Sequence, residues 1–127
     1  MSTLPPDTGI ILIDHGSKRV AANDLLLEVV RVFKETTGHA IVEPAHMELA
    51  DPTLMEAFSA CVEQGAKEVV IHPYFLAPGR HSTEDIPRMA EEAAALFPLI
   101  PYHVTEPLGI DSRLSEVILQ RINESLE

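Results

Sequence analysis

Four short apolar runs alternate with four amphipathic helical patterns along the 127 residues of this chain. The first run, "IILI" at residues 10–13, is rich in β-branched side chains, which is typical of a buried strand. Strands that alternate with helices predict a parallel sheet with right-handed crossovers. We therefore expect an α/β fold with a four-stranded parallel sheet in the order 2-1-3-4, flanked by helices on both faces.

Turn and capping residues set the expected limits of the other elements. Strands are expected within residues 39–49, 67–76 and 100–104. Helices are expected within residues 22–38, 51–65, 90–97 and 111–126. Residues 78–89, "PGRHSTEDIPRM", are predicted to form the one long loop.

Two of these helices carry more detailed expectations. In the helix within 51–65, Asp51 is the expected N-cap and Pro52 the first helical residue. The helix within 22–38 is expected to present one apolar face, made by Leu25, Leu26, Val29, Val32 and Phe33.

Length and composition limit the kind of protein that this chain can form. We expect a single domain over residues 1–127, with residues 1–8 as a flexible N-terminal segment. The net charge of −11 argues against nucleic acid or an anionic membrane as a partner, because both attract basic surfaces. The N-terminus "MSTLPPDTG" lacks the features of a signal peptide. The expected location is cytoplasmic, or a plastid where a transit peptide has been removed.

Polar and titratable side chains follow the predicted strands at the point where each strand ends. His15, with Gly16 and Ser17, follows the first strand, Glu48 follows the second, and His81 follows the third. Ligands of open α/β sheets bind outside the carboxyl ends of the strands, so these side chains are expected to converge. Imidazoles and a carboxylate without a thiolate suit a divalent ion such as iron(II), cobalt(II), nickel(II) or zinc. On local grounds alone, His81 is equally well explained as a surface residue of a loop.

The other histidines are expected to have structural roles. His39 follows a helix-ending glycine and is predicted to be solvated, whereas His72 and His103 are predicted to be core histidines. His46 stays open, because strand alternation puts it on the same face as Glu48.

Other chemistries receive no support from the sequence. Neither G-x-x-x-x-G-K-[ST] nor G-x-G-x-x-G occurs, so a nucleotide phosphate cradle is not predicted. Ser17 lacks the G-x-S-x-G context of a hydrolase nucleophile. Cys61 is the one cysteine, which excludes an internal disulfide, and its surroundings predict a small apolar residue on a helix.

Three motifs in a fixed order make the chain resemble a known family. They are "DHGSKR" after the first strand, "HMELADPT" after the second and "PYFLAPGRHSTEDIP" after the third. Together they resemble the class II chelatases, and among them the small single-unit sirohydrochlorin chelatases, from about residue 9 to about residue 123. "TGHAIVEPAHMELADPTL" and "FLAPGRH" are most similar to the plant and cyanobacterial-type sirohydrochlorin ferrochelatases.

The resemblance implies a chelatase-like fold and ATP-independent insertion of a divalent metal ion into sirohydrochlorin. It assigns metal handling and catalysis to His15, Glu48 and His81, with Glu43 as a competitor for the carboxylate role. The metal is a substrate: Fe²⁺, which gives sirohaem, is expected first, Co²⁺ for cobalamin synthesis is the alternative, and Ni²⁺ is a third choice. Neither a nucleotide nor an iron–sulfur cluster is expected, since the extra cysteines of plant relatives are missing here.

The same resemblance suggests how substrate and subunits meet. Ser17, Lys18, Arg19 and Arg80 are candidate contacts for the carboxylates of the tetrapyrrole, and plain surface solvation is the competing interpretation of these basic residues. Longer relatives hold two tandem copies of this unit, whereas this chain holds one, so a homodimer is expected.

Metal insertion requires an ion that is held loosely and a group that accepts pyrrole protons. Histidine side chains can do both, because imidazole titrates near neutrality. Two other functions stay open at this point: a metal-delivery protein that uses the same ligands, and a phosphoryl-transfer enzyme that uses His15 with Lys18 and Arg19.

Overall fold

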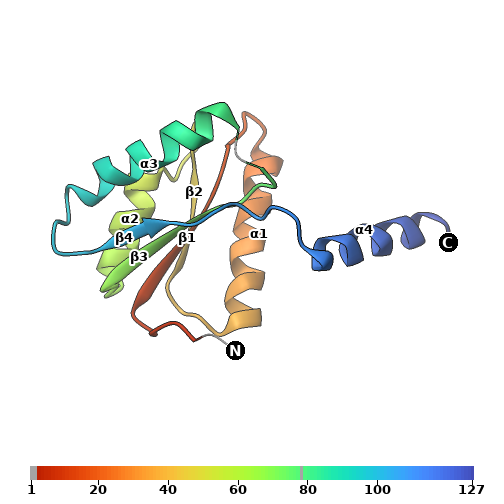
Figure 1. Cartoon of the computed structure of the whole chain (residues 1–127), viewed down its shortest axis with the longest axis horizontal. Helices are drawn as coiled ribbons and strands as arrows, with labels where there is room; N and C mark the ends of the chain where they lie inside the picture. The colour runs from red at the N-terminus through yellow and green to blue at the C-terminus, as the bar shows by residue number, and fades with distance from the viewer. Residues whose placement is uncertain (1–2, 78) are drawn as a thin grey trace.

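The computed structural model describes residues 3–77 and 79–127, without the side chains of residues 80–83. Strands and helices alternate along the whole described chain (Figure 1). The strands are β1 (Thr8–Asp14), β2 (Val42–His46), β3 (Glu68–Pro73) and β4 (Tyr102–Val104). The helices are α1 (Val20–Thr37), α2 (Leu54–Glu63), α3 (Arg80–Ala94) and α4 (Ser112–Ser125).

The four strands form one parallel sheet in the order β2-β1-β3-β4, which confirms the predicted topology. Asp14 at the end of β1 lies opposite His46 at the end of β2, and Ile13 lies opposite Pro73 at the end of β3. The carboxyl ends of these three strands therefore open at the same edge of the sheet.

Helices cover the two faces of the sheet unequally. On one face α2 and α3 pack against a large core that includes Ile11, Ile71 and the fully buried Phe58. On the other face α1 alone packs against β1 and β2, over a smaller core around Leu12 and Leu26 (Figure 1).

The structure corrects the predicted long loop. Helix α3 begins at Arg80, so most of residues 78–89 are helical, and Pro87 lies inside the helix. Ile86, Ala90 and Ala93 are buried against the large core at helical spacing, and this packing outweighs the one backbone N–H that proline lacks.

Two details of the other helices also differ from expectation. The N-cap of α2 is Thr53 rather than Asp51, and Thr53 and Glu56 form a reciprocal capping box. In α1 the buried residues are Leu26 and Val30, while the predicted face residues Leu25 and Val32 are 65% and 48% exposed. Val29 and Phe33 also pack against the smaller core, so the packed face keeps three of the five predicted residues and takes in Val30.

Helix α4 lies on neither face of the sheet. It projects away from the rest of the molecule, and none of its residues is buried (Figure 1). Asp111 caps its first turn by accepting a hydrogen bond from the backbone N–H of Arg113, at 2.9 Å.

Candidate functional site

The loop that follows β1 carries His15 at the exposed edge of the sheet. Gly16 adopts a left-handed backbone with φ of 86°, and its N–H donates to Asp14 Oδ1 at 3.1 Å. This hydrogen bond closes a tight turn, so the backbone of His15 is held between two constrained residues.

The loop that follows β2 lies directly against this turn. Met47 N donates to the carbonyl of Asp14 at 2.9 Å, and Glu48 N donates to the carbonyl of His15 at 3.3 Å. A Cβ atom on Gly16 would lie 1.9 Å from the Glu48 carbonyl oxygen, so only glycine fits here. The backbone thus brings His15 and Glu48, both exposed, into adjacent positions as the sequence predicted they would converge.

A hydrogen-bonded pair of side chains, His46 and Asp14, lies beneath these two loops. His46 is only 2% exposed, and its Nδ1 lies 2.5 Å from Asp14 Oδ1. The same carboxylate oxygen accepts the Gly16 N–H, so one atom of Asp14 links His46 to the turn that carries His15. His46 therefore lies behind the site rather than on its surface, which answers the question that its strand position left open.

The third loop adds an aromatic ring to the edge. Tyr74 N donates to the carbonyl of Ile13 at 2.7 Å, which holds the end of β3 against β1. Phe75 stacks on the imidazole of His15, with ring centroids 4.5 Å apart and an interplanar angle of 24°. This ring restricts the orientation of His15, and sequence analysis had not assigned it a role.

The candidate substrate contacts begin where α1 starts. The side chain of Asn23 bonds both the N–H and the carbonyl of Ser17, at 2.9 and 2.8 Å, and Ser17 Oγ accepts from Arg19 N at 3.0 Å. Ser17 is therefore engaged in shaping the loop, whereas Lys18 and Arg19 are exposed.

Two of the predicted site residues, Arg80 and His81, have side chains outside the described residues. Their backbone lies in the first turn of α3, not in a long loop. Among the described side chains, no three His, Cys, Asp or Glu residues gather closely enough to hold a metal ion. The described part of the predicted metal site is therefore His15 and Glu48, while Ser17, Lys18 and Arg19 are the described candidate substrate contacts.

Glu43 does not reach this edge. It pairs with Ile11 in the middle of β2, and its negative charge acts on Cys61 in the large core. Burial, followed by the charge of Glu43, raises the pKa of the Cys61 thiol to about 12, which agrees with an unreactive apolar cysteine.

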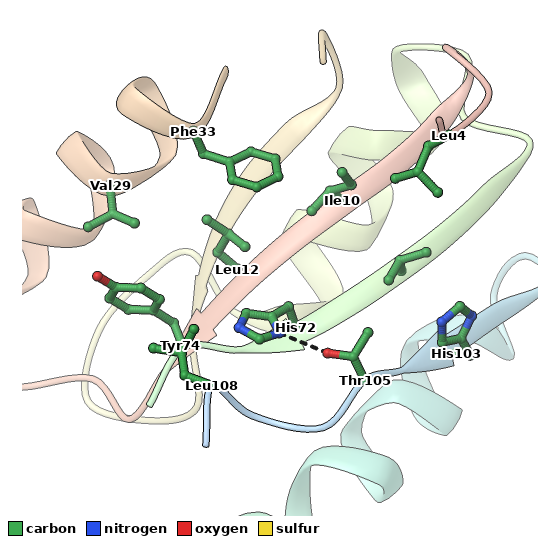
Figure 2. A pocket seen from close by; sticks show the side chains of 11 residues that line it. Leu4, Ile10, Leu12, Val29, Phe33, His72, Tyr74, His103, Thr105 and Leu108 are labelled. Atoms are coloured by element: carbon green, nitrogen blue, oxygen red, sulfur yellow. Dashed lines mark hydrogen bonds between the residues drawn. The ribbon is translucent and has the colours of Figure 1, made fainter. Parts of the chain in front are cut away.

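The remaining histidines differ from their predicted roles. His39 is buried rather than solvated, and its Nε2 lies 2.5 Å from the carbonyl oxygen of Thr8. His72 is half-buried, with Nδ1 2.8 Å from Thr105 Oγ1. His103 is exposed rather than part of a core. Both His72 and His103 line an apolar cavity of about 480 Å³ on the open half of the sheet (Figure 2).

Comparison with known proteins identifies the family. A family model described as CbiX matches residues 9–125, which is nearly the whole chain. The chain belongs to the CbiX family. Within the described residues, this CbiX chain has no helix that is long and apolar enough to span a membrane.

Two curated relatives differ in how much of their length this CbiX chain spans. It is 53% identical over 118 residues to the chloroplastic sirohydrochlorin ferrochelatase of Arabidopsis thaliana. This alignment covers 93% of the present chain and 52% of the plant protein. It is 30% identical over 137 residues to the sirohydrochlorin cobaltochelatase of Methanopyrus kandleri. This alignment covers 92% of the present chain and 96% of the archaeal protein. The chain thus spans about half the length of the plant relative.

A solved structure shows the same relation. The sirohydrochlorin chelatase SirB from Bacillus subtilis, in complex with cobalt, superposes with a TM-score of 0.84 at 28% identity. The alignment covers 92% of this CbiX chain and 50% of that chain. This likeness confirms the predicted chelatase-like fold.

Proposed function

We propose that this protein is a sirohydrochlorin chelatase, which inserts a divalent metal ion into the tetrapyrrole without ATP. The observation that carries the proposal is the 53% identity to a sirohydrochlorin ferrochelatase over 93% of the chain. The adjacent positions of His15 and Glu48 at the carboxyl ends of β1 and β2 support it, because ligands bind there in open α/β sheets.

In the proposed mechanism His15, Glu48 and His81 receive the metal ion as a substrate. A ligand set of two imidazoles and one carboxylate is incomplete, so the ion can leave for the macrocycle. Insertion releases two pyrrole protons, of which His15 accepts one, and the second goes to Glu48 or, where Glu48 only balances the positive charge, to His81. The ring of Phe75 holds the imidazole of His15 in one orientation during these steps.

The basic residues near the site suit the acidic substrate. Lys18 and Arg19 are exposed at the start of α1, and Arg80 begins α3. We propose that these three side chains, together with Ser17, contact the carboxylates of sirohydrochlorin. They provide local positive charge on a chain whose net charge is −11.

We propose Fe²⁺ as the physiological metal and Co²⁺ as the alternative. The plant relative with 53% identity is a ferrochelatase, whereas the archaeal relative of similar length is a cobaltochelatase. Both ions accept imidazole and carboxylate ligands. Neither a nucleotide nor an iron–sulfur cluster has a role in the proposed reaction.

The proposal extends to assembly and location. We propose that the chain acts as one domain and that two copies form a homodimer; the expected flexible segment does not include Thr8, which is buried in β1. The support for the dimer is the expectation that longer relatives hold two copies of this unit, with which the 50% coverage of the SirB chain agrees. A chloroplastic relative supports a plastid location, and the cytoplasm is the alternative.

The test is a metal-insertion assay with purified protein and sirohydrochlorin, followed by absorption spectroscopy. Fe²⁺, Co²⁺ and Ni²⁺ are compared side by side, each against the spontaneous rate without protein. Many turnovers per protein molecule, fastest with Fe²⁺, are expected. A protein that binds the ions but does not accelerate insertion is a metal-delivery protein, and this outcome would overturn the proposal.

A further inference from the structure

The imidazole of His15 is oriented by an aromatic ring rather than by a hydrogen bond. It stacks on the ring of Phe75, with centroids 4.5 Å apart and an interplanar angle of 24°. Within the part of the chain that the structure describes, neither ring nitrogen of His15 forms a hydrogen bond. Histidines that bind metal ions usually donate their second N–H to a carboxylate or a carbonyl, which fixes the ring. At His15 the stack takes the place of that bond.

Stacking and hydrogen bonding have different consequences for a ligand that must release its ion. A hydrogen-bonded carboxylate orients the imidazole and also strengthens the bond between its nitrogen and the metal. An apolar ring covers one face of the imidazole, and both nitrogens, which lie at the ring edge, remain open to an ion or a proton. His15 is thereby oriented and stays a weak ligand, as transfer of the ion to a macrocycle requires.

The position of the Phe75 ring is set by the fold around it. Its side chain is half-buried against the large core that α2 and α3 cover. Its backbone N–H donates to the carbonyl of Pro73 at 3.0 Å, and the N–H of Tyr74 donates to the carbonyl of Ile13 in β1 at 2.7 Å. The ring therefore has a fixed base from which to hold the exposed His15.

Residues 105–111, which we call the β4–α4 connection, complete this support. Leu108 N donates to the carbonyl of Phe75 at 3.0 Å, and Gly109 N donates to the carbonyl of Leu76 at 2.8 Å. The connection thus runs along the loop that follows β3 (Figure 1). Because β3 lies between β1 and β4 in the sheet, the connection acts on the loop after β1 through the loop after β3.

We propose that the β4–α4 connection belongs to the active site as a positioning element that acts through Phe75. The two backbone bonds keep the Phe75 loop in place, and the Phe75 ring keeps the imidazole of His15 in the orientation that the ion requires. The connection lies outside all three sequence motifs, so sequence analysis gave it no role. The inference rests on the proposed function, since it names what supports the histidine that handles the metal.

The first experiment removes the ring and keeps an apolar side chain. Phe75→Leu is compared with Phe97→Leu, a matched control, because Phe97 packs against the same core and stacks on Phe58 with centroids 5.7 Å apart. With Fe²⁺ and sirohydrochlorin, kcat of Phe75→Leu is expected to fall about 10–100-fold while KM for sirohydrochlorin stays parental. Phe97→Leu is expected to lower Tm and to keep the parental kcat and KM.

The second experiment removes single N–H groups without changing a side chain. Because Cys61 is the one cysteine, a synthetic peptide of residues 61–127 can be ligated there to a recombinant thioester of residues 1–60, which restores the full chain. A backbone ester at Leu108 removes the bond to Phe75. An ester at Ile110, whose N–H forms no hydrogen bond among the described residues, is the control.

The ester at Leu108 is expected to lower kcat about fivefold, the effect of one neutral hydrogen bond, and the ester at Ile110 is expected to change nothing. In a chain that already carries Phe75→Leu, the Leu108 ester is expected to cause no further loss, because its effect passes through the ring that is missing.

Proton NMR measures the stack itself, without metal or tetrapyrrole. The ring current of Phe75 moves the imidazole proton signals of His15 upfield, and His15→Ala assigns these signals. At one fixed pH, Phe75→Leu and the Leu108 ester are expected to move them toward the values of an exposed histidine, whereas the ester at Ile110 leaves them in place.

The possible results separate this inference from the proposed function. A raised KM with an unchanged kcat in Phe75→Leu would make Phe75 a substrate contact and overturn the inference. Losses that add in the combined variant, or signals of His15 that do not respond to the Leu108 ester, would show that the connection does not act through Phe75. A parent protein that does not accelerate metal insertion overturns the proposed function instead, and with it any role of the stack in the reaction.

Discussion

Two regions of this chain differ in how many contacts they make with the rest of it. The loops that follow β1 and β2 are tightly bonded to each other, whereas the C-terminal helix α4 is almost free of contacts with the sheet. The two loops are joined by backbone hydrogen bonds from Met47 and Glu48, and by a hydrogen bond between Asp14 and the buried His46. Helix α4 has no buried residue and is supported by its cap and by exposed ion pairs, which contribute little stability.

The comparison shows that the two loops are bonded within the chain, whereas the apolar side chains of α4 are exposed. The loops satisfy their polar groups within the chain, so their geometry exists before any substrate arrives. The apolar residues of α4 are exposed, and an apolar cavity of about 480 Å³ lies open between α1 and β4. Firmly bonded loops and an exposed apolar helix thus occur within one chain of 127 residues.

The largest predicted effect comes from removing the close approach of the two loops. Gly16→Ala requires a strained left-handed backbone and places Cβ against the Glu48 carbonyl, which is backbone and cannot swing aside. The displaced loops are expected to lower the metal-insertion rate by at least about a hundredfold.

Gly38→Ala is the matched control. Gly38 also has a positive φ of 74°, but a Cβ there meets nothing within 4 Å. Both variants are expected to lose about 1–2 kcal/mol of stability from backbone strain, with a further loss in Gly16→Ala from the contact with the Glu48 carbonyl. Thermal melts measure these losses, and only Gly16→Ala is expected to lose activity. Equal activity in the two variants would show that the loop contact does not matter for the reaction.

A smaller effect is expected from the carboxylate beneath the loops. Asp14→Asn keeps the shape of the side chain but removes the charge that pairs with His46, so the turn at Gly16 is held less firmly. Outer-shell changes of this kind cost about 10–100-fold in activity or metal affinity. Insertion rates measure the activity of Asp14→Asn, and Co²⁺ titrations measure its metal affinity. Parental values of both would show that Asp14 does not support the site.

The smallest predicted effect is a pH dependence of stability that comes from His72, which lines the apolar cavity between α1 and β4. Burial lowers the pKa of His72 below that of an unfolded histidine, and a hydrogen bond with the Glu106 backbone opposes this in part. The neutral imidazole therefore stabilises the fold fully above about pH 6.5, and this stability is lost as the pH falls through the lower pKa of the folded state. His72→Gln is expected to reduce the fall in Tm between neutral and mildly acidic pH. An unchanged fall in Tm contradicts the assignment.

The sequence predicts the strand order and the convergence of His15 with Glu48, because both follow from the alternation of strands and helices. It does not predict the pairing of His46 with Asp14, which requires the register between two strands that are 32 residues apart. The burial of His39 likewise depends on a distant partner, the carbonyl of Thr8.

Local signals misled the prediction in the region of α3. Gly79, the polar run after it and Pro87 are typical of a loop, whereas the spacing of Ile86, Ala90 and Ala93 indicates a helix. The position of α4 is beyond any reading of its sequence, because an amphipathic pattern does not specify which surface the helix packs on.

The central claim is that the histidine at the end of β1 meets the metal ion. The most direct measurement is the initial rate of metal insertion into sirohydrochlorin by the parent, by His15→Ala and by His39→Gln, with folding checked by circular dichroism. His39 lies at the amino end of β1, so its variant controls for the loss of a histidine away from the site. The account predicts at least about a hundredfold loss for His15→Ala and a nearly parental rate for His39→Gln. A folded His15→Ala protein that inserts metal at the parental rate would contradict the claim.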